Sequence, residues 1–280
     1  MVSFQYQINF VQILMKQGIT SYKIRKIILE ESKRAHVGHI ASALSIADII
    51  AVLFEHVLYL PGTKHPDRDR FILSKGHAAL VLYAALFLKD ILTRDQLATY
   101  CSDGTLLGVH PEYQLDGVDF STGSLGQGLA FGAGVALASR LSGAGYRVFV
   151  LVSDAECNEG SLWETIMFAA HHKLSNLVAI VDNNGQQALG KTKDVIDLNP
   201  LGEKWQTFGW NIHEVDGHSV PDLHNILCGL DLQSGSPHVV IANTIAGKGV
   251  SFMEGKVAWH YLPLSDEQYA QAIKELEETQ

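Results

Sequence analysis

The sequence predicts an α/β fold in which a mainly parallel sheet has helices on both faces. Residues 147–152 and 177–181 are continuous apolar runs of strand length, as expected for strands that are buried on both sides. The helical stretch 160–172 lies between them, and strand and helix signals alternate along the rest of the chain. We expect one domain over residues 1–280, in which residues 1–20 form an N-terminal extension.

The N-terminal part of this domain is expected to be helical. Isoleucines recur at helical spacing among Lys and Arg in residues 21–34, which indicates an amphipathic helix with Ser21 as a possible cap. Residues 45–54 are apolar enough to form a mostly buried helix. His39 lies in the loop between these helices, where its simplest interpretation is a packing and hydrogen-bonding residue.

A short buried strand is predicted at residues 70–74. The polar residues Lys75-Gly76-His77 follow it directly and lead into a helix at residues 78–88, which is rich in Ala and Leu. Polar side chains and a glycine thus stand where a strand ends and a helix begins, which is a common place for a site in an open α/β sheet.

A glycine-rich segment at residues 121–128 precedes a predicted helix at residues 129–141. Because no clear strand comes before it, the segment is a poor match to a dinucleotide fingerprint. Gly132 and Gly134 within the helix suggest that it packs closely against another helix.

The C-terminal part continues the alternation of strand and helix. A polar, turn-rich loop at residues 185–200 is expected to cover the site. The other predicted elements are a short helix at 93–100, strands at 211–215 and 239–243, a helix at 221–230 and a terminal helix at 264–278.

Composition limits the class of protein. The chain has 280 residues, of which 47% are hydrophobic and 18% charged, as in a soluble globular protein. Its net charge of -9 gives no general attraction to nucleic acid or to an anionic membrane. Three widely spaced cysteines indicate a reducing, cytoplasmic location, and neither a signal peptide nor a membrane-spanning segment is predicted.

Two strand ends carry oxygen ligands. Asp154 follows the strand at 147–152, and Asn184 follows the strand at 177–181. One carboxylate, one amide and a backbone carbonyl beside phosphate oxygens would suit Mg²⁺ or Ca²⁺. The spacing alone is equally compatible with an ordinary crossover that has polar strand ends.

Six motifs, taken in order, resemble the N-terminal half of a transketolase over residues 20–262. This half is the domain that binds the diphosphate of thiamine diphosphate, called the PP domain. The motifs are His36-Val37-Gly38-His39, Ser74-Lys75-Gly76-His77-Ala78, His110-Pro111-Glu112, Thr122-Gly123-Ser124-Leu125-Gly126-Gln127-Gly128, the stretch 154–160, and Trp259-His260.

The resemblance implies which residues bind the metal and the cofactor. Asp154 and Asn184 match the family's metal ligands, and Gln186 matches the position that adds a backbone carbonyl. Residues assigned to thiamine diphosphate by the same comparison are His77, Gly123, Ser124, Leu125, Asp154, Ala155, Glu159, Asn184 and Lys248, of which Gly123 and Leu125 match contacts to the aminopyrimidine ring.

The resemblance also implies catalytic residues. His39, His77, His110 and His260 match histidines that contact cofactor or sugar hydroxyls and assist proton transfer, for which a pKa near neutrality is suitable. Glu159 matches a carboxylate that meets the partner domain at a subunit interface. The implied reaction transfers a two-carbon ketol unit from a ketose to an aldose, with a small sugar or sugar phosphate as substrate.

Three departures bear on this expectation. Ala155 replaces a glycine that usually follows the metal-binding aspartate, which adds a methyl group near the diphosphate. Ala246 stands where some relatives have a lysine, so Lys248 is a possible substitute. Residues 261–263 are Tyr-Leu-Pro, where many relatives have Gly-Lys-Pro, and the missing cation puts a sugar-phosphate substrate in doubt.

Length implies a split enzyme. The pyrimidine-binding and C-terminal domains of a transketolase do not fit in 280 residues, so we expect a second polypeptide that carries them, in an α2β2 heterotetramer. Two other interpretations are open: the α subunit of a 2-oxo acid dehydrogenase, which the spaced histidines disfavour, and a noncatalytic scaffold subunit.

Overall fold

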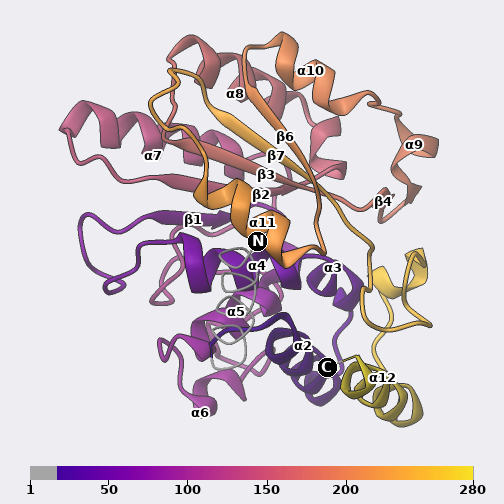
Figure 1. Cartoon of the computed structure of the whole chain (residues 1–280). Coiled ribbons are helices and arrows are strands. Elements are labelled where there is room, and N and C mark those ends of the chain that lie inside the picture. The colour runs from indigo at the N-terminus through magenta and orange to yellow at the C-terminus, as the bar shows by residue number, and fades with distance from the viewer. Residues whose placement is uncertain (1–17, 280) are drawn as a thin grey trace, which may run out of the picture.

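The computed structural model describes residues 18–279, and its centre is a five-stranded parallel sheet with the order β1-β2-β3-β7-β6 (Figure 1). The predicted N-terminal extension at residues 1–20 lies mostly outside this range. The strands are β1 (Arg70–Leu73), β2 (Val148–Ser153), β3 (Leu177–Asn183), β6 (Asn211–Asp216) and β7 (His238–Asn243). The α/β class with a mainly parallel sheet is therefore confirmed.

Helices cover both faces of this sheet, as predicted (Figure 1). One face packs against helices from the N-terminal part and against α11 (Val220–Cys228); the N-terminal helices are α2 (Ser21–Ala35), α3 (Ile40–Leu44), α4 (Ala47–Val52) and α5 (Ala79–Leu88). The other face packs against α7 (Gly128–Ser142), α8 (Gly160–His171) and α10 (Leu201–Thr207).

Alternate residues of one strand contribute to different cores because side chains alternate across a strand. In β2, Phe149 and Leu151 join the core beneath the N-terminal helices, whereas Val148, Val150 and Val152 join the core beneath α7 and α8. All of these side chains are fully buried. Burial on both faces explains why the strand is a continuous apolar run.

The first helices differ from the prediction at two places. Thr20, and not Ser21, is the N-cap of α2, because its Oγ1 accepts a hydrogen bond of 3.2 Å from the Lys23 N–H. The predicted helix at 45–54 is shorter than expected: α4 begins only at Ala47, and a π-helical turn, Leu53–Val57, replaces its last part. Ser45 lies at the break between α3 and α4, and its hydroxyl donates a hydrogen bond of 2.8 Å to Asp182.

The prediction that Gly132 and Gly134 pack against another helix is wrong. A Cβ atom on Gly132 would lie 2.3 Å from the Val150 side chain, so this glycine allows α7 to approach the sheet. Gly134 faces open space.

The remaining differences are in short elements. The expected loop at 185–200 contains a two-stranded hairpin, β4 (Gln186–Gln187) and β5 (Gly190–Lys191), and α9 (Thr192–Val195). Helix α10 was not predicted. Two further helices, the short α6 (Arg94–Leu97) and the terminal α12 (Asp266–Glu278), lie within the predicted ranges. Within residues 18–279, no helix has both the length and the apolar character needed to cross a bilayer.

Candidate active site

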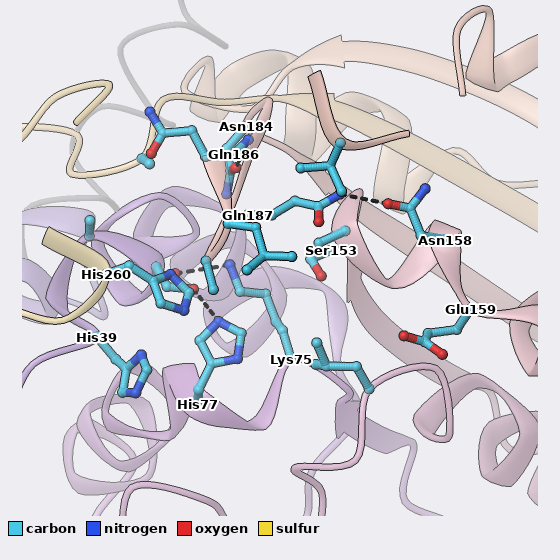
Figure 2. A pocket seen from close by; sticks show the side chains of 18 of the residues that line it. His39, Lys75, His77, Ser153, Asn158, Glu159, Asn184, Gln186, Gln187 and His260 are labelled. Atoms are coloured by element: carbon cyan, nitrogen blue, oxygen red, sulfur yellow. Dashed lines mark hydrogen bonds between the residues drawn. The ribbon is translucent and has the colours of Figure 1, made fainter. Parts of the chain in front are cut away.

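A cavity of about 500 Å³ lies at the carboxyl ends of β1, β2, β3 and β7, the edge where open α/β sheets bind ligands (Figure 2). Ten of the predicted site residues line it: His39, His77, His110, Gly123, Leu125, Ala155, Glu159, Asn184, Gln186 and His260. Ser42, Lys75, Ser153, Asn158, Gln187 and Ala246 are further lining residues.

Three imidazoles form a cluster on one side of the cavity (Figure 2). The ring centroids are 4.9 Å apart for His39 and His260, 5.2 Å for His77 and His260, and 5.4 Å for His39 and His77. The Ser42 hydroxyl lies 2.8 Å from Nε2 of His77. The backbone N–H of His39 donates a hydrogen bond of 3.2 Å to the backbone carbonyl of His260. Thus three segments that are far apart in the sequence share one cluster.

These histidines are kept neutral. The pKa of His260 is lowered to about 4, mainly by burial and also by the nearby His39 and Lys75. The pKa of His77 is lowered well below its usual value, mainly by burial and next by the charge of Lys75. The pKa of His39 is also lowered, first by burial and then by His110. Nδ1 of His39 is buried without a hydrogen-bond partner among the residues that the structure describes. A neutral imidazole has one nitrogen that can donate a proton and one that can accept it.

Lys75 and Asp182 form a buried ion pair beside the cluster. The Lys75 ammonium contacts Asp182 Oδ2 and donates to the Ser42 carbonyl at 3.0 Å. Asp182 also accepts hydrogen bonds from Ser45 and Thr244. The pair therefore joins the end of β1 to the ends of β3 and β7. Sequence reasoning did not identify it, although both residues stand at predicted strand ends.

Asp154 is a buried carboxylate at the end of β2. Its Oδ2 accepts hydrogen bonds from the Gly185 N–H at 2.9 Å and the Thr192 hydroxyl at 2.8 Å. Burial, with a smaller contribution from Asp182, raises the pKa of Asp154 to about 6 in spite of the bond from Thr192. A buried carboxylate with a raised pKa is a good partner for a cation. Asp154 faces a second, adjoining cavity of about 380 Å³, whose wall also contains Asn184.

Asn184 and Gln186 are placed beside Asp154 by the turn at the end of β3. The Asn184 amide donates to Asp182 Oδ2 at 2.8 Å, and its Oδ1 accepts from the Gln186 N–H at 2.9 Å. Since the side-chain oxygen and the backbone of this turn are close together, the segment offers oxygen ligands of the predicted kind. No group of three His, Cys, Asp or Glu residues suited to a metal occurs in residues 18–279, so a cation here would depend on the Asp154 carboxylate together with amide, carbonyl and phosphate oxygens.

Glu156 organises the glycine-rich segment. Its Oε1 accepts hydrogen bonds from the Ser74 hydroxyl at 2.5 Å and the Gly126 N–H at 2.9 Å, and its Oε2 accepts from the Ser153 N–H at 2.9 Å. Burial raises the pKa of Glu156. The carboxylate thus ties the loop before α7 to two strand ends. Its place two residues after Asp154 was a signal that the sequence analysis did not use.

Glu159 lies at the opposite side of the cavity from the histidine cluster (Figure 2). It is exposed, and its carboxylate has no hydrogen-bond partner in the described part of the chain. Besides Asp154, two predicted residues, Ser124 and Lys248, are not among the described residues that line the main cavity. Ser124 is exposed, and the Lys248 ammonium lies 3.8 Å from Glu254.

Two segments meet at the rim of the cavity. The Tyr261 hydroxyl donates to the Ala188 carbonyl at 2.9 Å, which links the segment after the turn Val257–His260 to the β4–β5 hairpin. Leu189 and Ile196 line the cavity, yet 82% and 55% of their surface is exposed. The rim is therefore apolar and accessible in the isolated chain.

Comparisons with known proteins agree with this arrangement. A family model described as the transketolase thiamine diphosphate binding domain matches residues 17–277. The 6-deoxy-6-sulfo-D-fructose transketolase subunit SqwG of a Clostridium species is 39% identical over 259 residues, which are 91% of this chain and 94% of that protein. One subunit of the apulose-4-phosphate transketolase of Phocaeicola vulgatus is 36% identical over 262 residues, 93% of each protein.

Solved structures of transketolases are also similar to this chain. Transketolase from Campylobacter jejuni superposes with a TM-score of 0.86 at 28% identity. The match covers 95% of this chain but only 43% of that chain. This chain thus spans nearly the whole length of the subunit relatives and less than half of the solved transketolase.

Proposed function

This chain belongs to the transketolase family as a transketolase-like N-terminal subunit, and we propose that its cavity holds the diphosphate end of thiamine diphosphate with a divalent cation. The cluster of three neutral histidines at the carboxyl edge of the sheet is the observation that carries the proposal. The reaction would transfer a two-carbon ketol unit from a ketose to an aldose.

The residues present fit the cofactor and the cation. The buried Asp154 carboxylate, with its pKa raised to about 6, would be stabilised by a cation, and Asn184 and the Gln186 carbonyl would supply further oxygens. The unpartnered Nδ1 of His39 is a polar atom that a ligand or water can satisfy. Residues 18–279 would form one domain, because both hydrophobic cores share the same sheet.

When bound, the cofactor supplies the carbon nucleophile and the electron sink for the ketol unit. The chain's own residues would position the substrate and move protons. The Ser42 hydroxyl orients the His77 ring through Nε2 of that ring, and His77 would exchange a proton with a substrate hydroxyl. His39 and His260 would form hydrogen bonds to neighbouring hydroxyls of the substrate. His110 lines the same cavity beside Gly123 and would contact the cofactor or the sugar.

A second polypeptide would complete the site. Two of the relatives described above are named as subunits, and this chain corresponds to 43% of the Campylobacter jejuni transketolase. The exposed Glu159 carboxylate would meet that partner, which would carry the pyrimidine-binding and C-terminal domains in an α2β2 assembly. The names of the relatives support a ketose donor with an anionic group at its far end. Lys75 is the only lysine of the described residues that lines the cavity, and it is paired with Asp182, so the partner would bind that group.

Reconstitution tests this proposal. We expect the purified chain with its partner, thiamine diphosphate and Mg²⁺ to transfer ketol units from ketose donors, and the chain alone to be inactive. Robust turnover without the partner would contradict the split arrangement. Activity on 2-oxo acids alone would favour the dehydrogenase α subunit, and calorimetry without cofactor binding by the complex would favour a scaffold.

A further inference from the structure

A buried network outside the cavity connects three parts of the chain. Arg25 of α2 donates two hydrogen bonds to the Asp48 carboxylate of α4, at 3.1 and 2.5 Å. Nδ1 of His218, which lies between β6 and α11, is 2.8 Å from Asp48 Oδ2. The side chains of all three are at most 12% exposed. We call this set the Arg25–Asp48–His218 network.

The network ends on the backbone of the turn that follows β7. Nε2 of His218 accepts a hydrogen bond of 2.9 Å from the Ile245 N–H. Nε of Arg25 donates one of 3.1 Å to the Lys248 carbonyl. Both ends of the segment 245–248 are thus bonded to side chains from outside the sheet.

These bonds determine the tautomer of His218. Its Nε2 accepts from a backbone N–H, so Nδ1 must carry the proton and donate to Asp48. Burial alone would raise the pKa of Asp48, but the hydrogen bond from His218 and the charge of Arg25 lower it well below its usual value. Asp48 is therefore a carboxylate that orients two different donors.

The turn held in this way forms part of the cavity wall. Ala246 lines the cavity, and the Gly247 N–H donates to the Ala41 carbonyl of α3 at 2.9 Å. Gly249 has a φ of +92°, and a Cβ atom there would lie 3.2 Å from Cδ of Arg25, so the turn fits closely against the arginine. A shift of the turn would move Ala246 relative to the histidine cluster.

We propose that Arg25, Asp48 and His218 are positioning residues that fix residues 245–248 as a wall of the cofactor cavity. The proposal rests on the proposed function for the identity of the cofactor. The fixing of the turn itself depends only on the hydrogen bonds.

Amide hydrogen exchange on the full chain tests the fixing of the turn directly. We expect His218→Leu to increase exchange in peptides covering residues 245–248 by about five- to tenfold, the effect of losing one hydrogen bond. His218→Gln keeps one donor and one acceptor, so it should restore most of the protection. His224→Leu is the matched control, because His224 is also partly buried and contacts His56 instead of the turn.

Cofactor binding to the complex with its partner gives the second readout. His218→Leu should weaken the affinity for thiamine diphosphate with Mg²⁺ by about five- to tenfold, while kcat at saturating cofactor changes by less than about twofold. Unchanged exchange in His218→Leu overturns the proposal, as does increased exchange with unchanged cofactor affinity. If the wild-type complex binds no thiamine diphosphate, the proposed function fails, and exchange still reports on the turn.

Discussion

The Lys75 ammonium and the Asp182 carboxylate form an ion pair whose side chains are 1% and 0% exposed. The pair lies where β1 and β3 end, and its hydrogen bonds reach Ser42, Ser45 and Thr244. Two charges so deeply buried are stable only together, because each is desolvated and depends on the other for compensation.

Removing one charge of this pair should strongly destabilise the fold. We expect Lys75→Met to lower the free energy of unfolding by about 3–5 kcal/mol, because it leaves the Asp182 carboxylate buried and uncompensated. The double variant Lys75→Met/Asp182→Asn should recover more than half of the loss. Urea denaturation measures both. Lys64→Met is the control, since Lys64 is 86% exposed and should change stability by less than about 1 kcal/mol. If Lys75→Met lowered the free energy of unfolding no more than Lys64→Met, the buried pair would be unimportant for stability.

Asp154→Asn should separate cation binding from stability. Without the carboxylate, we expect thiamine diphosphate to lose its Mg²⁺-dependent binding, because the diphosphate charge needs a bridging cation. The unliganded chain should lose no more than about 1 kcal/mol, since the asparagine oxygen can still accept a hydrogen bond and a buried charge is removed. Calorimetry with and without Mg²⁺ and thermal unfolding test the two parts. Asp197→Asn, in the wall of the adjoining cavity, is the control. Wild-type affinity in Asp154→Asn would refute the metal assignment.

Two glycines in the same region should respond in opposite ways to alanine. Gly126 has a φ of +81°, and a Cβ atom there would lie 2.6 Å from Cβ of Glu159, so Gly126→Ala should cost about 1–3 kcal/mol and displace Glu159. Gly134 is helical and faces open space, so Gly134→Ala should stabilise the chain by about 0.5–1 kcal/mol. Denaturant unfolding of both variants tests the contrast, which equal effects would contradict.

Acid should destabilise the folded chain through the histidine cluster. The pKa of His260 is lowered to about 4 in the folded state, whereas an unfolded histidine titrates near 6.5. Between these values the unfolded chain binds more protons, so stability falls as the pH falls from 6.5 towards 4. After allowance for solvent screening of this half-buried ring, the loss between pH 7 and pH 5 is about 1 kcal/mol from His260. His260→Gln should reduce the pH dependence of unfolding by this amount; an unchanged slope would show that His260 is not kept neutral.

His77→Ala should affect turnover more than cofactor binding. The imidazole is placed by Ser42, and its loss removes a proton-transfer group while leaving Asp154 and Asn184 in place. We expect kcat of the reconstituted complex to fall by about 10²- to 10⁴-fold, with only a modest change in thiamine diphosphate affinity. Steady-state kinetics and calorimetry measure the two effects. Turnover like that of the wild type would reduce His77 to a packing residue, and exposed His65→Ala is the control.

The sequence predicts the elements whose burial pattern is regular. The buried strands β2 and β3 are continuous apolar runs, and α2 has its isoleucines at helical spacing. Helix α10 is short and buries only Leu201 and Trp205, so its pattern is too brief to distinguish it from a loop.

Long-range polar contacts are the part of the site that the sequence does not reveal. Lys75 and Asp182 are 107 residues apart, and His218 is 170 residues from Asp48. No local rule of spacing connects such pairs. The four candidate histidines are predicted through the family resemblance, because each one alone looks like an ordinary core or loop residue. The role of Lys248 stays a prediction: its ammonium lies 3.8 Å from Glu254, and Ala246 is the residue of this turn that lines the cavity.

The strand order also determines when each strand can find its neighbour while the chain is being synthesised. Strand β7 lies between β3 and β6, although β6 is made before it (Figure 1). Until residue 243 has left the ribosome, β6 has no neighbour in the main sheet and β3 keeps one unpaired edge. An apolar, unpaired edge is the kind through which nascent chains aggregate. Ala246 and His260, which line the cavity, come after β7 in the chain, so the cavity cannot be complete before the last strand of the sheet has been made.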